Sequence, residues 1–155
     1  MKHPAIAAGP QKQLDGFLAK YAPEIASRAR AILAKLGKRM PGAIVLVYDN
    51  YNALAIGFGG SERASDIVLS VAAFPKWVSL FLMGGPKLKD PRKLLKGSGT
   101  RVRHIVLENA AMLDDPAIGD LIDQAIARAR VPIDPHAKSR IVIKSISAKQ
   151  RPRRP

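Results

Sequence analysis

The residues whose types and spacing are best suited to chemistry lie in Leu94–Leu107, which reads LLKGSGTRVRHIVL. Two glycines flank a serine, so the backbone there can adopt positive φ angles and approach a bound group closely. Free backbone N–H groups beside lysine and arginine side chains suit an anion. The candidate anion-binding residues are Lys96, Gly97, Ser98, Gly99, Thr100, Arg101 and Arg103. The alternative is an ordinary connection with a solvated basic rim, since neither common phosphate-binding glycine motif is present.

Other chemistry is weakly represented. The three histidines, His3, His104 and His136, have no metal-type spacing. Four aspartates between residues 114 and 123 have the oxygen ligands of a hard cation, but helix capping and dipole complementation explain them more simply. No serine has a recognisable base partner. We therefore expect no catalytic residue, no metal site and no bound cofactor, which favours a binding module over an enzyme that acts on an anionic small molecule.

The charge balance points to polyanion partners. The chain has 26 Lys and Arg against 12 Asp and Glu, a formal net charge of +14. Such a charge favours anionic small molecules or nucleic acid as partners and says nothing about fold. The basic residues concentrate in Lys87–Lys96 and in the C-terminal tail. The candidate polyanion-binding residues of the tail are Lys138, Arg140, Lys144, Lys149, Arg151, Arg153 and Arg154. The alternative is a solvated tail with no specific partner.

The compartment follows from what is absent. Cysteine does not occur, which excludes disulfides and thiolate metal sites and suits the reducing cytoplasm. The most apolar segment, residues 67–85, carries Pro75 and Lys76 at its centre. A charge at mid-bilayer is costly, so this segment predicts two strands joined by a turn. We expect a cytoplasmic protein without a membrane partner.

Periodicity predicts the elements that position these residues. Apolar residues at helical spacing predict helices over residues 14–21 and 23–36, with Gly37 as the C-terminal cap of the second. Asp115 followed by Pro116 predicts the start of a third helix, which extends to about residue 129. Alternating β-branched and aromatic residues predict strands, and a weaker alternation suggests an edge strand. The predicted strands cover residues 43–48, 53–58, 66–73, 76–83 and 100–107, and the edge strand covers 139–147.

The strand at residues 53–58 has two unequal faces. Leu54, Ile56 and Phe58 point one way, and we assign them to the face packed under the helices. Ala53, Ala55 and Gly57 point the other way and suggest the floor of a groove. The alternative is that a bulky neighbour such as Tyr48 or Trp77 fills the space above them.

The chain divides into three parts by composition. Residues 1–12 form a small, Pro- and Gly-punctuated leader that we expect to be mobile. Residues 13–135 form one domain, and residues 136–155 form a basic C-terminal tail. The last residues, Lys149–Pro155, read as a disordered basic arm.

The order of these elements resembles the YdhG-like domain of unknown function. The resemblance rests on the pattern L-L-x-G-x-G-x-x-V-R-H-I-x-L at residues 94–107, on the Asp115-Pro116 helix start and on the N-terminal helix pair. It implies an α+β fold of the frataxin-like, YjbR/CyaY-like superfamily. In that fold an antiparallel sheet of about five strands carries the N-terminal helices and a C-terminal helix on one face.

The resemblance also implies an alternative function. Frataxin-like iron chaperones bind iron through an acidic ridge on the first helix. Here the first two helices carry only Asp15 and Glu24 among several lysines and arginines, which disfavours iron binding. The remaining functions are a small binding module for an anionic ligand or partner, and non-specific nucleic-acid binding through the basic tail.

Overall fold

The computed structural model describes residues 9–155 of the 155-residue chain. The α-helices within these residues are α2 (Pro10–Ala19), α3 (Pro23–Arg39) and α4 (Pro116–Ala127). The strands are β1 (Ile44–Asp49), β2 (Leu54–Gly59), β3 (Ile67–Ala73), β4 (Val78–Met83), β5 (Val102–Val106) and β6 (Arg140–Ile146). Short 3-10 helices occupy η1 (Ala64–Asp66), η2 (Gly85–Lys87) and η3 (Ala110–Asp114).

The helix ends follow local chemistry. Each of the three α-helices begins at a proline, whose fixed φ angle suits the first turn. The predicted cap of α4 is confirmed, because the Asp115 side chain accepts a hydrogen bond from the Ala117 N–H at 2.9 Å. The predicted cap at Gly37 is wrong, because α3 continues to Arg39 and is capped at Met40. A glycine inside a helix is tolerated at a cost of about 1 kcal/mol, and here it leaves open space beside the helix.

The strands form one mixed sheet in the order β5-β4-β3-β2-β1-β6. Strands β1 to β5 pair antiparallel with their neighbours in sequence, whereas β6 lies parallel to β1. The expectation of an antiparallel sheet of about five strands is therefore wrong at one edge. A parallel neighbour needs a long crossover connection, and the chain from the end of β5 through α4 to β6, residues 107–139, provides it. Gly42, at φ 83°, allows this connection to pass close by, since a Cβ there would lie 1.8 Å from the Asp134 carbonyl oxygen.

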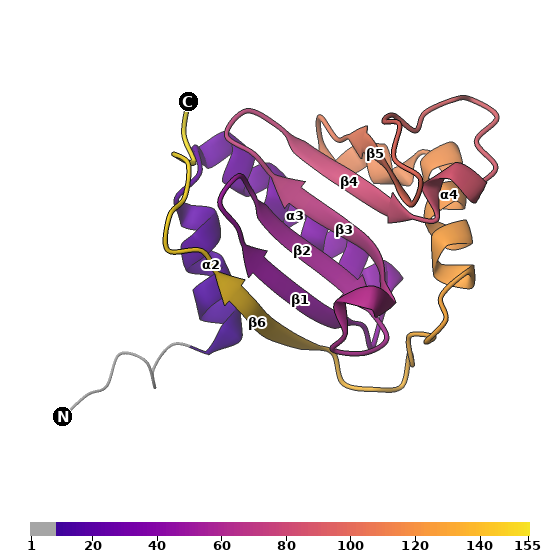
Figure 1. The fold of residues 1–155 in the computed structure, drawn as a ribbon, viewed down its shortest axis with the longest axis horizontal. Helices are drawn as coiled ribbons and strands as arrows, with labels where there is room; N and C mark the ends of the chain where they lie inside the picture. Colours follow the sequence, from indigo (N-terminus) through magenta and orange to yellow (C-terminus); the bar gives the residue numbers. More distant parts are fainter. Residues whose placement is uncertain (1–8) are drawn as a thin grey trace.

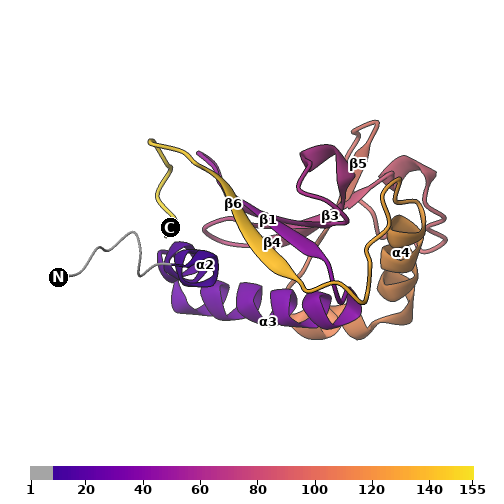
Figure 2. The same cartoon turned by 90° about the horizontal axis from the view of Figure 1, so that it is seen from below.

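The helices cover one face of the sheet, as predicted. Figure 2 shows α2 and α3 beneath the strands, with α4 at the far end. One apolar core joins the three helices to this face. The large residues of β2 point into it, as expected: Leu54 and Ile56 are fully buried and Phe58 is 3 % exposed. The class is therefore α+β, with the helices gathered on one side (Figure 1).

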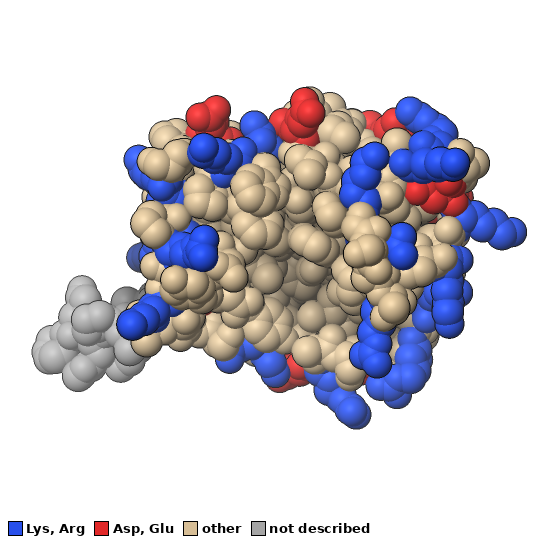
Figure 3. Space-filling model, turned by 45° about the horizontal axis from the view of Figure 1, so that its top comes forward, with Lys and Arg blue, Asp and Glu red and all other residues tan. Residues whose placement is uncertain are grey.

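The other face of the sheet carries no helix. On β2, β3 and β4, the positions that point away from the helices hold small or apolar residues and no charged one. Figure 3 shows an uncharged, hollowed surface bordered by lysine and arginine on this side of the molecule. The predicted small floor at Gly57 is covered by Ile67 of the adjacent strand, whose Cδ1 atom would lie 2.6 Å from a Cβ at this position. Ile67 therefore covers Gly57, and Tyr48 lies opposite Ala55 on the same face, in agreement with the alternative that a bulky neighbour fills this space.

The C-terminal residues are folded against the sheet. The suggested edge strand is confirmed as β6. The expectation of a disordered arm over Lys149–Pro155 is wrong, because Arg153 is 5 % exposed and its guanidinium contacts the buried Asp49 carboxylate at 2.9 Å. A buried acid needs a partner, and the basic tail supplies one from 104 residues away.

Only part of the predicted mobile leader, residues 1–12, lies among the residues that the structure describes. Residues 1–8 lie outside the described residues, whereas Pro10, Gln11 and Lys12 form the first turn of α2. The apolar segment 67–85 forms the β3–β4 hairpin, as predicted. Across residues 9–155, no helix has both the length and the apolar character needed to cross a membrane.

Candidate functional site

The predicted anion loop lies at the outer edge of the sheet, beyond β5. Lys96 and His104 form an isolated antiparallel bridge, with N–H to carbonyl distances of 2.8 and 3.0 Å. Residues 97–101 therefore form the tip of a hairpin-like excursion. Gly97 has a φ of 105°, the positive angle that its residue type predicted. The prediction of a positive φ angle in this glycine loop is therefore confirmed at Gly97.

The lysine and arginine side chains of this loop do not line a cavity in the described part of the chain. The Arg103 Nε–H donates to the Gly99 carbonyl at 2.9 Å, so this guanidinium closes the loop. The Arg101 carbonyl accepts from the N–H groups of Gly84 and Gly85, which fixes the loop base. All residues from Lys96 to Arg101 are exposed. Anion binding by Lys96, Gly97, Ser98, Gly99, Thr100, Arg101 and Arg103 stays a prediction.

The four aspartates near α4 contact neighbouring polar side chains. Asp114 contacts Lys35 at 2.8 Å and Asp123 contacts Arg39 at 2.9 Å. Asp115 contacts Arg92 and caps α4, while Asp120 accepts from Gln124. Among residues 9–155, no group of three or more His, Asp or Glu side chains is placed to hold a metal ion. Helix capping, ion pairs with lysine and arginine, and the hydrogen bond from Gln124 therefore engage all four carboxylates.

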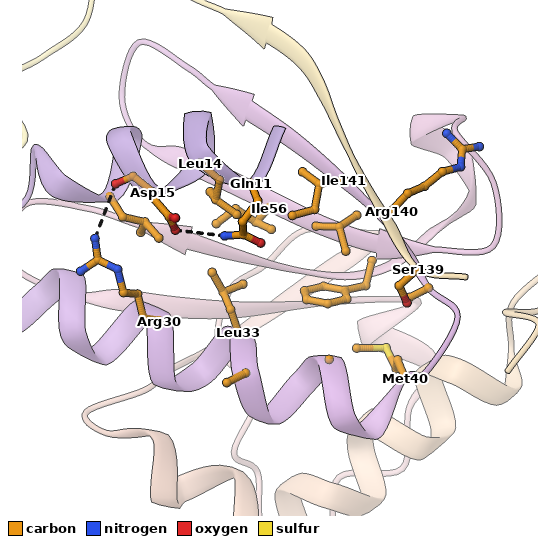
Figure 4. Close-up of a pocket in the computed structure, with 16 residues that line it drawn as sticks. Gln11, Leu14, Asp15, Arg30, Leu33, Met40, Ile56, Ser139, Arg140 and Ile141 are labelled. Carbon is orange, nitrogen blue, oxygen red and sulfur yellow. Dashed lines mark hydrogen bonds between the residues drawn. The ribbon is translucent and has the colours of Figure 1, made fainter. Parts of the chain in front are cut away.

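The structure shows a cavity of about 520 Å³ that sequence reasoning missed. It lies between α2, α3 and the β1–β6 edge of the sheet (Figure 4). Its wall is mainly apolar, since Val45, Ile56 and Phe58 come from the sheet and Ile141 comes from β6. The helices contribute Leu14, Leu18, Leu33, Ala34 and Gly37, and Met40 directly follows α3. Pockets for small ligands typically have volumes of about 300–1,000 Å³ and apolar linings with a few polar groups.

Each helix turns one regular face to this cavity. Gln11, Leu14, Asp15 and Leu18 of α2 are spaced i, i+3, i+4, i+7, and so are Arg30, Leu33, Ala34 and Gly37 of α3. The core stripe of α3 is a different face, formed by Ile25, Ala29, Ile32 and Leu36. The small residues at 34 and 37 leave the space open. This second stripe was the signal available in the sequence.

Polar groups stand at the two ends of the cavity. At one end, Arg30 donates to the Asp15 carbonyl at 3.5 Å, and Gln11 donates to the Asp15 carboxylate at 3.0 Å. At the other end, Figure 4 shows Ser139 near Met40 and the Arg140 side chain directed away from the cavity. Arg140 forms an ion pair with Glu62. Within the described chain, Arg30 makes no ion pair. It is therefore the cation available to a ligand.

The candidate polyanion-binding residues of the tail differ in their burial and in their bonding partners. Arg153 is buried, Arg140 pairs with Glu62, and Lys144 donates to the Glu62 carbonyl at 3.1 Å. Arg154 donates to the Lys20 carbonyl at 3.2 Å. Lys138, Lys149 and Arg151 are exposed. The predicted polyanion-binding set therefore contains one residue, Arg153, whose guanidinium cannot reach a partner without leaving the core.

Burial and hydrogen bonding shift the titration of three groups. Burial raises the pKa of Tyr21, against the opposing effect of Arg153. Its hydroxyl donates to the Ala73 carbonyl at 2.7 Å and accepts from Leu54. Burial also raises the pKa of Tyr48, whose hydroxyl has no partner among the described residues. A hydrogen bond from Ser61, aided by Arg130 and Arg63, lowers the pKa of Asp66. None of the three lines the 520 Å³ cavity.

Comparison with family models, with curated proteins and with solved structures finds no match for this chain. The resemblance to the YdhG-like domain and the frataxin-like arrangement stay predictions that rest on residues 94–107 and on the order of the elements.

Proposed function

We propose that this protein is a small binding module for an amphipathic anion, a molecule with an apolar body and one carboxylate. The carrying observation is the apolar cavity with the Arg30 guanidinium at one end and no ion pair on that guanidinium within the described chain. The function class predicted from the sequence, a module for an anionic ligand, is kept. The proposed binding residues are different ones.

The lining supports an apolar body. Ile56 and Phe58 line the sheet side of the cavity and are almost fully buried, so the apolar core lies directly behind this wall. Burying apolar ligand surface there contributes roughly 25 cal/mol per Å² before the costs of association. The described lining has few groups that would hydrogen-bond to a polar body. A hydrocarbon chain or a ring system fits this lining better than a sugar or a nucleotide.

The end near Arg30 supports a carboxylate. A guanidinium offers paired N–H donors that match a carboxylate in a bidentate way. Asp15 is the opposing charge at this end, and its carboxylate accepts from Gln11. Replacing Asp15 by Asn should therefore strengthen binding of an anion, and replacing Arg30 by Gln should weaken it. A cationic ligand would show the reverse pattern for both variants.

A thermal-shift titration tests the proposal. Decanoate is the probe, and decanol and decyltrimethylammonium, with the same chain length, are the comparisons. A ligand that binds only the native state raises Tm, and at one hundred times Kd the gain is about 2.7 kcal/mol. We expect decanoate to raise Tm most, and Arg30→Gln to reduce that shift.

A matched pair of glycine variants separates the cavity from the rest of the surface. A Cβ at Gly37 or at Gly16 meets no atom within 4 Å, and both glycines lie inside helices. Only Gly37 lines the cavity. Gly37→Leu should abolish the decanoate shift while the protein stays folded, whereas Gly16→Leu should leave it intact. An equal decanoate shift in both variants, or no shift in the natural sequence, would overturn the proposal.

A further inference from the structure

The C-terminal residues 147–154, called the strap below, wrap around the turn between β1 and β2. The Ser147 N–H donates to the Asp49 carbonyl at 2.8 Å, and the Arg151 N–H donates to the Tyr51 carbonyl at 2.9 Å. The Gln150 side chain donates to the Asp49 carbonyl at 3.2 Å. The strap backbone therefore has a fixed path over one end of the sheet.

Arg153 anchors the strap. Its side chain is 3 % exposed, and the Asp49 side chain that it contacts is 1 % exposed. The same guanidinium donates to the carbonyls of Asn50 and Tyr51 and lies 5.8 Å from the centre of the Tyr21 ring. Breaking a buried ion pair leaves an uncompensated charge. This anchor holds the neighbouring residues of the strap in place.

Four exposed cations lie on the strap and at the end of α2. Lys149, Arg151 and Arg154 come from the strap, and Lys20 follows α2. Arg154 donates to the Lys20 carbonyl at 3.2 Å, so the strap and the end of α2 meet here. Within the described residues, Lys149, Arg151 and Arg154 make no ion pair. The one carboxylate in contact with the group, that of Asp49, is buried and already shared by Arg153 and Lys20. The surface is therefore strongly positive.

Two exposed aromatic rings lie at the same end of the sheet. Tyr51, in the β1–β2 turn, is 47 % exposed, and the Arg151 guanidinium lies 5.6 Å from its ring centre. Trp77, before β4, is 41 % exposed and stacks on Phe74 at 4.6 Å. The pairs Asp49–Leu54, Leu54–Ala73 and Ala73–Val78 are in register. The β1–β2 turn and the β3–β4 turn therefore project from the same end of the sheet. Figure 1 shows the C-terminus beside these turns.

We propose that this end of the molecule binds single-stranded nucleic acid without sequence preference. Lys20, Lys149, Arg151 and Arg154 contact phosphates, and the rings of Tyr51 and Trp77 stack on unpaired bases. Exposed aromatic rings beside cations are the combination that single-strand-binding proteins use. Bases in a duplex are already stacked and offer no free face to a ring at its side. This site is separate from the cavity near Arg30 and does not depend on the proposed function.

Fluorescence anisotropy with a labelled oligothymidylate, titrated at several salt concentrations, tests the proposal. Four phosphate contacts on a single strand predict a slope of log K against log salt of about −3. The double variant Lys149→Gln, Arg151→Gln should reduce the magnitude of that slope by about 1.4. Tyr51→Ala and Trp77→Ala should each weaken binding about tenfold, since one stacked base contributes roughly 1–3 kcal/mol.

A matched variant removes the same charge elsewhere. Lys87 and Lys89 are exposed and follow the opposite end of β4. The variant Lys87→Gln, Lys89→Gln should keep the salt slope, because these lysines lie away from the strap. An equal loss in both double variants would show an effect of net charge alone and would overturn the site. Equal affinity for duplex DNA would contradict the stacking.

An anionic membrane is the competing partner, because its phosphates attract the same cations. Co-sedimentation with phosphatidylserine vesicles, at the same salt concentrations, tests it. Binding of vesicles but not of oligothymidylate, with the same loss in the Lys149 and Arg151 double variant, would assign this end to a lipid surface and overturn the proposal. Binding of the oligonucleotide, lost in that variant with an unchanged Tm, supports it.

Discussion

Two basic segments look alike in the sequence and differ in the structure. The loop from Lys96 to Arg103 stays at the surface, and its one described side-chain bond to the backbone is from Arg103 to its own loop. The segment from Lys138 to Arg154 adds a strand to the sheet and buries Arg153 against Asp49. The difference lies in the partner, because only the second segment meets a buried carboxylate. Charge density in a sequence does not tell a structural cation from a solvated one.

The largest expected effect comes from removing the second segment. Deletion of residues 138–155 should destabilise the fold by roughly 5 kcal/mol or more, because it removes the Arg153 partner of Asp49 and exposes apolar surface of β1. Total stabilities are about 5–15 kcal/mol. Urea denaturation followed by circular dichroism measures the loss. An unchanged urea midpoint would show that this segment is a solvated tail that does not stabilise the fold.

A single substitution in the strap should have the next largest effect. Arg153→Ala should destabilise by about 3 kcal/mol, since one buried partner of Asp49 is lost. The neighbouring variant Arg154→Ala is the control, because Arg154 is exposed and should matter by about 0.5 kcal/mol or less. Equal urea midpoints for the two variants would show that burial of Arg153 is unimportant. Adding Asp49→Ala to Arg153→Ala should recover part of the loss.

Asp66 is an intermediate case, a buried acid with an exposed cation. Its side chain is 1 % exposed, whereas that of its partner Arg130 is 68 % exposed. The hydrogen bond from Ser61 holds the pKa of Asp66 below its usual value. A lowered folded-state pKa stabilises the fold above about pH 4, the unfolded value, and this stabilisation disappears as pH falls through the folded-state pKa.

Ser61→Ala should therefore lower stability at neutral pH by less than Arg153→Ala does. The gap between variant and natural sequence should close as the pH falls below 4. Urea midpoints across this range provide the measurement. A gap of constant size at every pH would mean that Ser61 acts through packing and leaves the pKa of Asp66 unchanged.

The smallest expected effect belongs to the glycine loop. Arg103→Ala removes one partly exposed hydrogen bond to the Gly99 carbonyl. Such a bond contributes about 1 kcal/mol or less to stability. Thermal unfolding compares this variant directly with Arg153→Ala. A loss from Arg103→Ala as large as that from Arg153→Ala would break the distinction between the two segments.

Most of the fold could be predicted from local patterns in the sequence. The α3 stripe, the Asp115 cap and the alternation of β2 were readable because each depends on neighbours a few residues away. The parallel pairing of β6 with β1 was not readable, because its partner lies about a hundred residues earlier and β6 alternates weakly. The prediction of a disordered arm at Arg153 was wrong for the same reason, because its partner Asp49 lies 104 residues earlier in the chain.

The candidate site was harder to predict than the fold. The cavity takes its walls from α2, α3, β1, β2 and β6, and no single segment contains the pattern. Only the second stripe of α3, with small residues at Ala34 and Gly37, carried a local signal. The glycine loop attracted the prediction instead, because glycine and arginine side by side are conspicuous in a sequence even where each has a local structural role.

Hydrogen exchange, read residue by residue, tests the contrast between the two segments most directly. Backbone amides that are hydrogen-bonded in a stable sheet exchange slowly, and amides of exposed loops exchange fast. We expect slow exchange at Ser147 and Arg151 and at the β6 amides paired with β1, comparable to that of β2. Residues 97–101 should exchange fast. Exchange at Ser147, Arg151 and β6 as fast as at residues 97–101 would contradict the account.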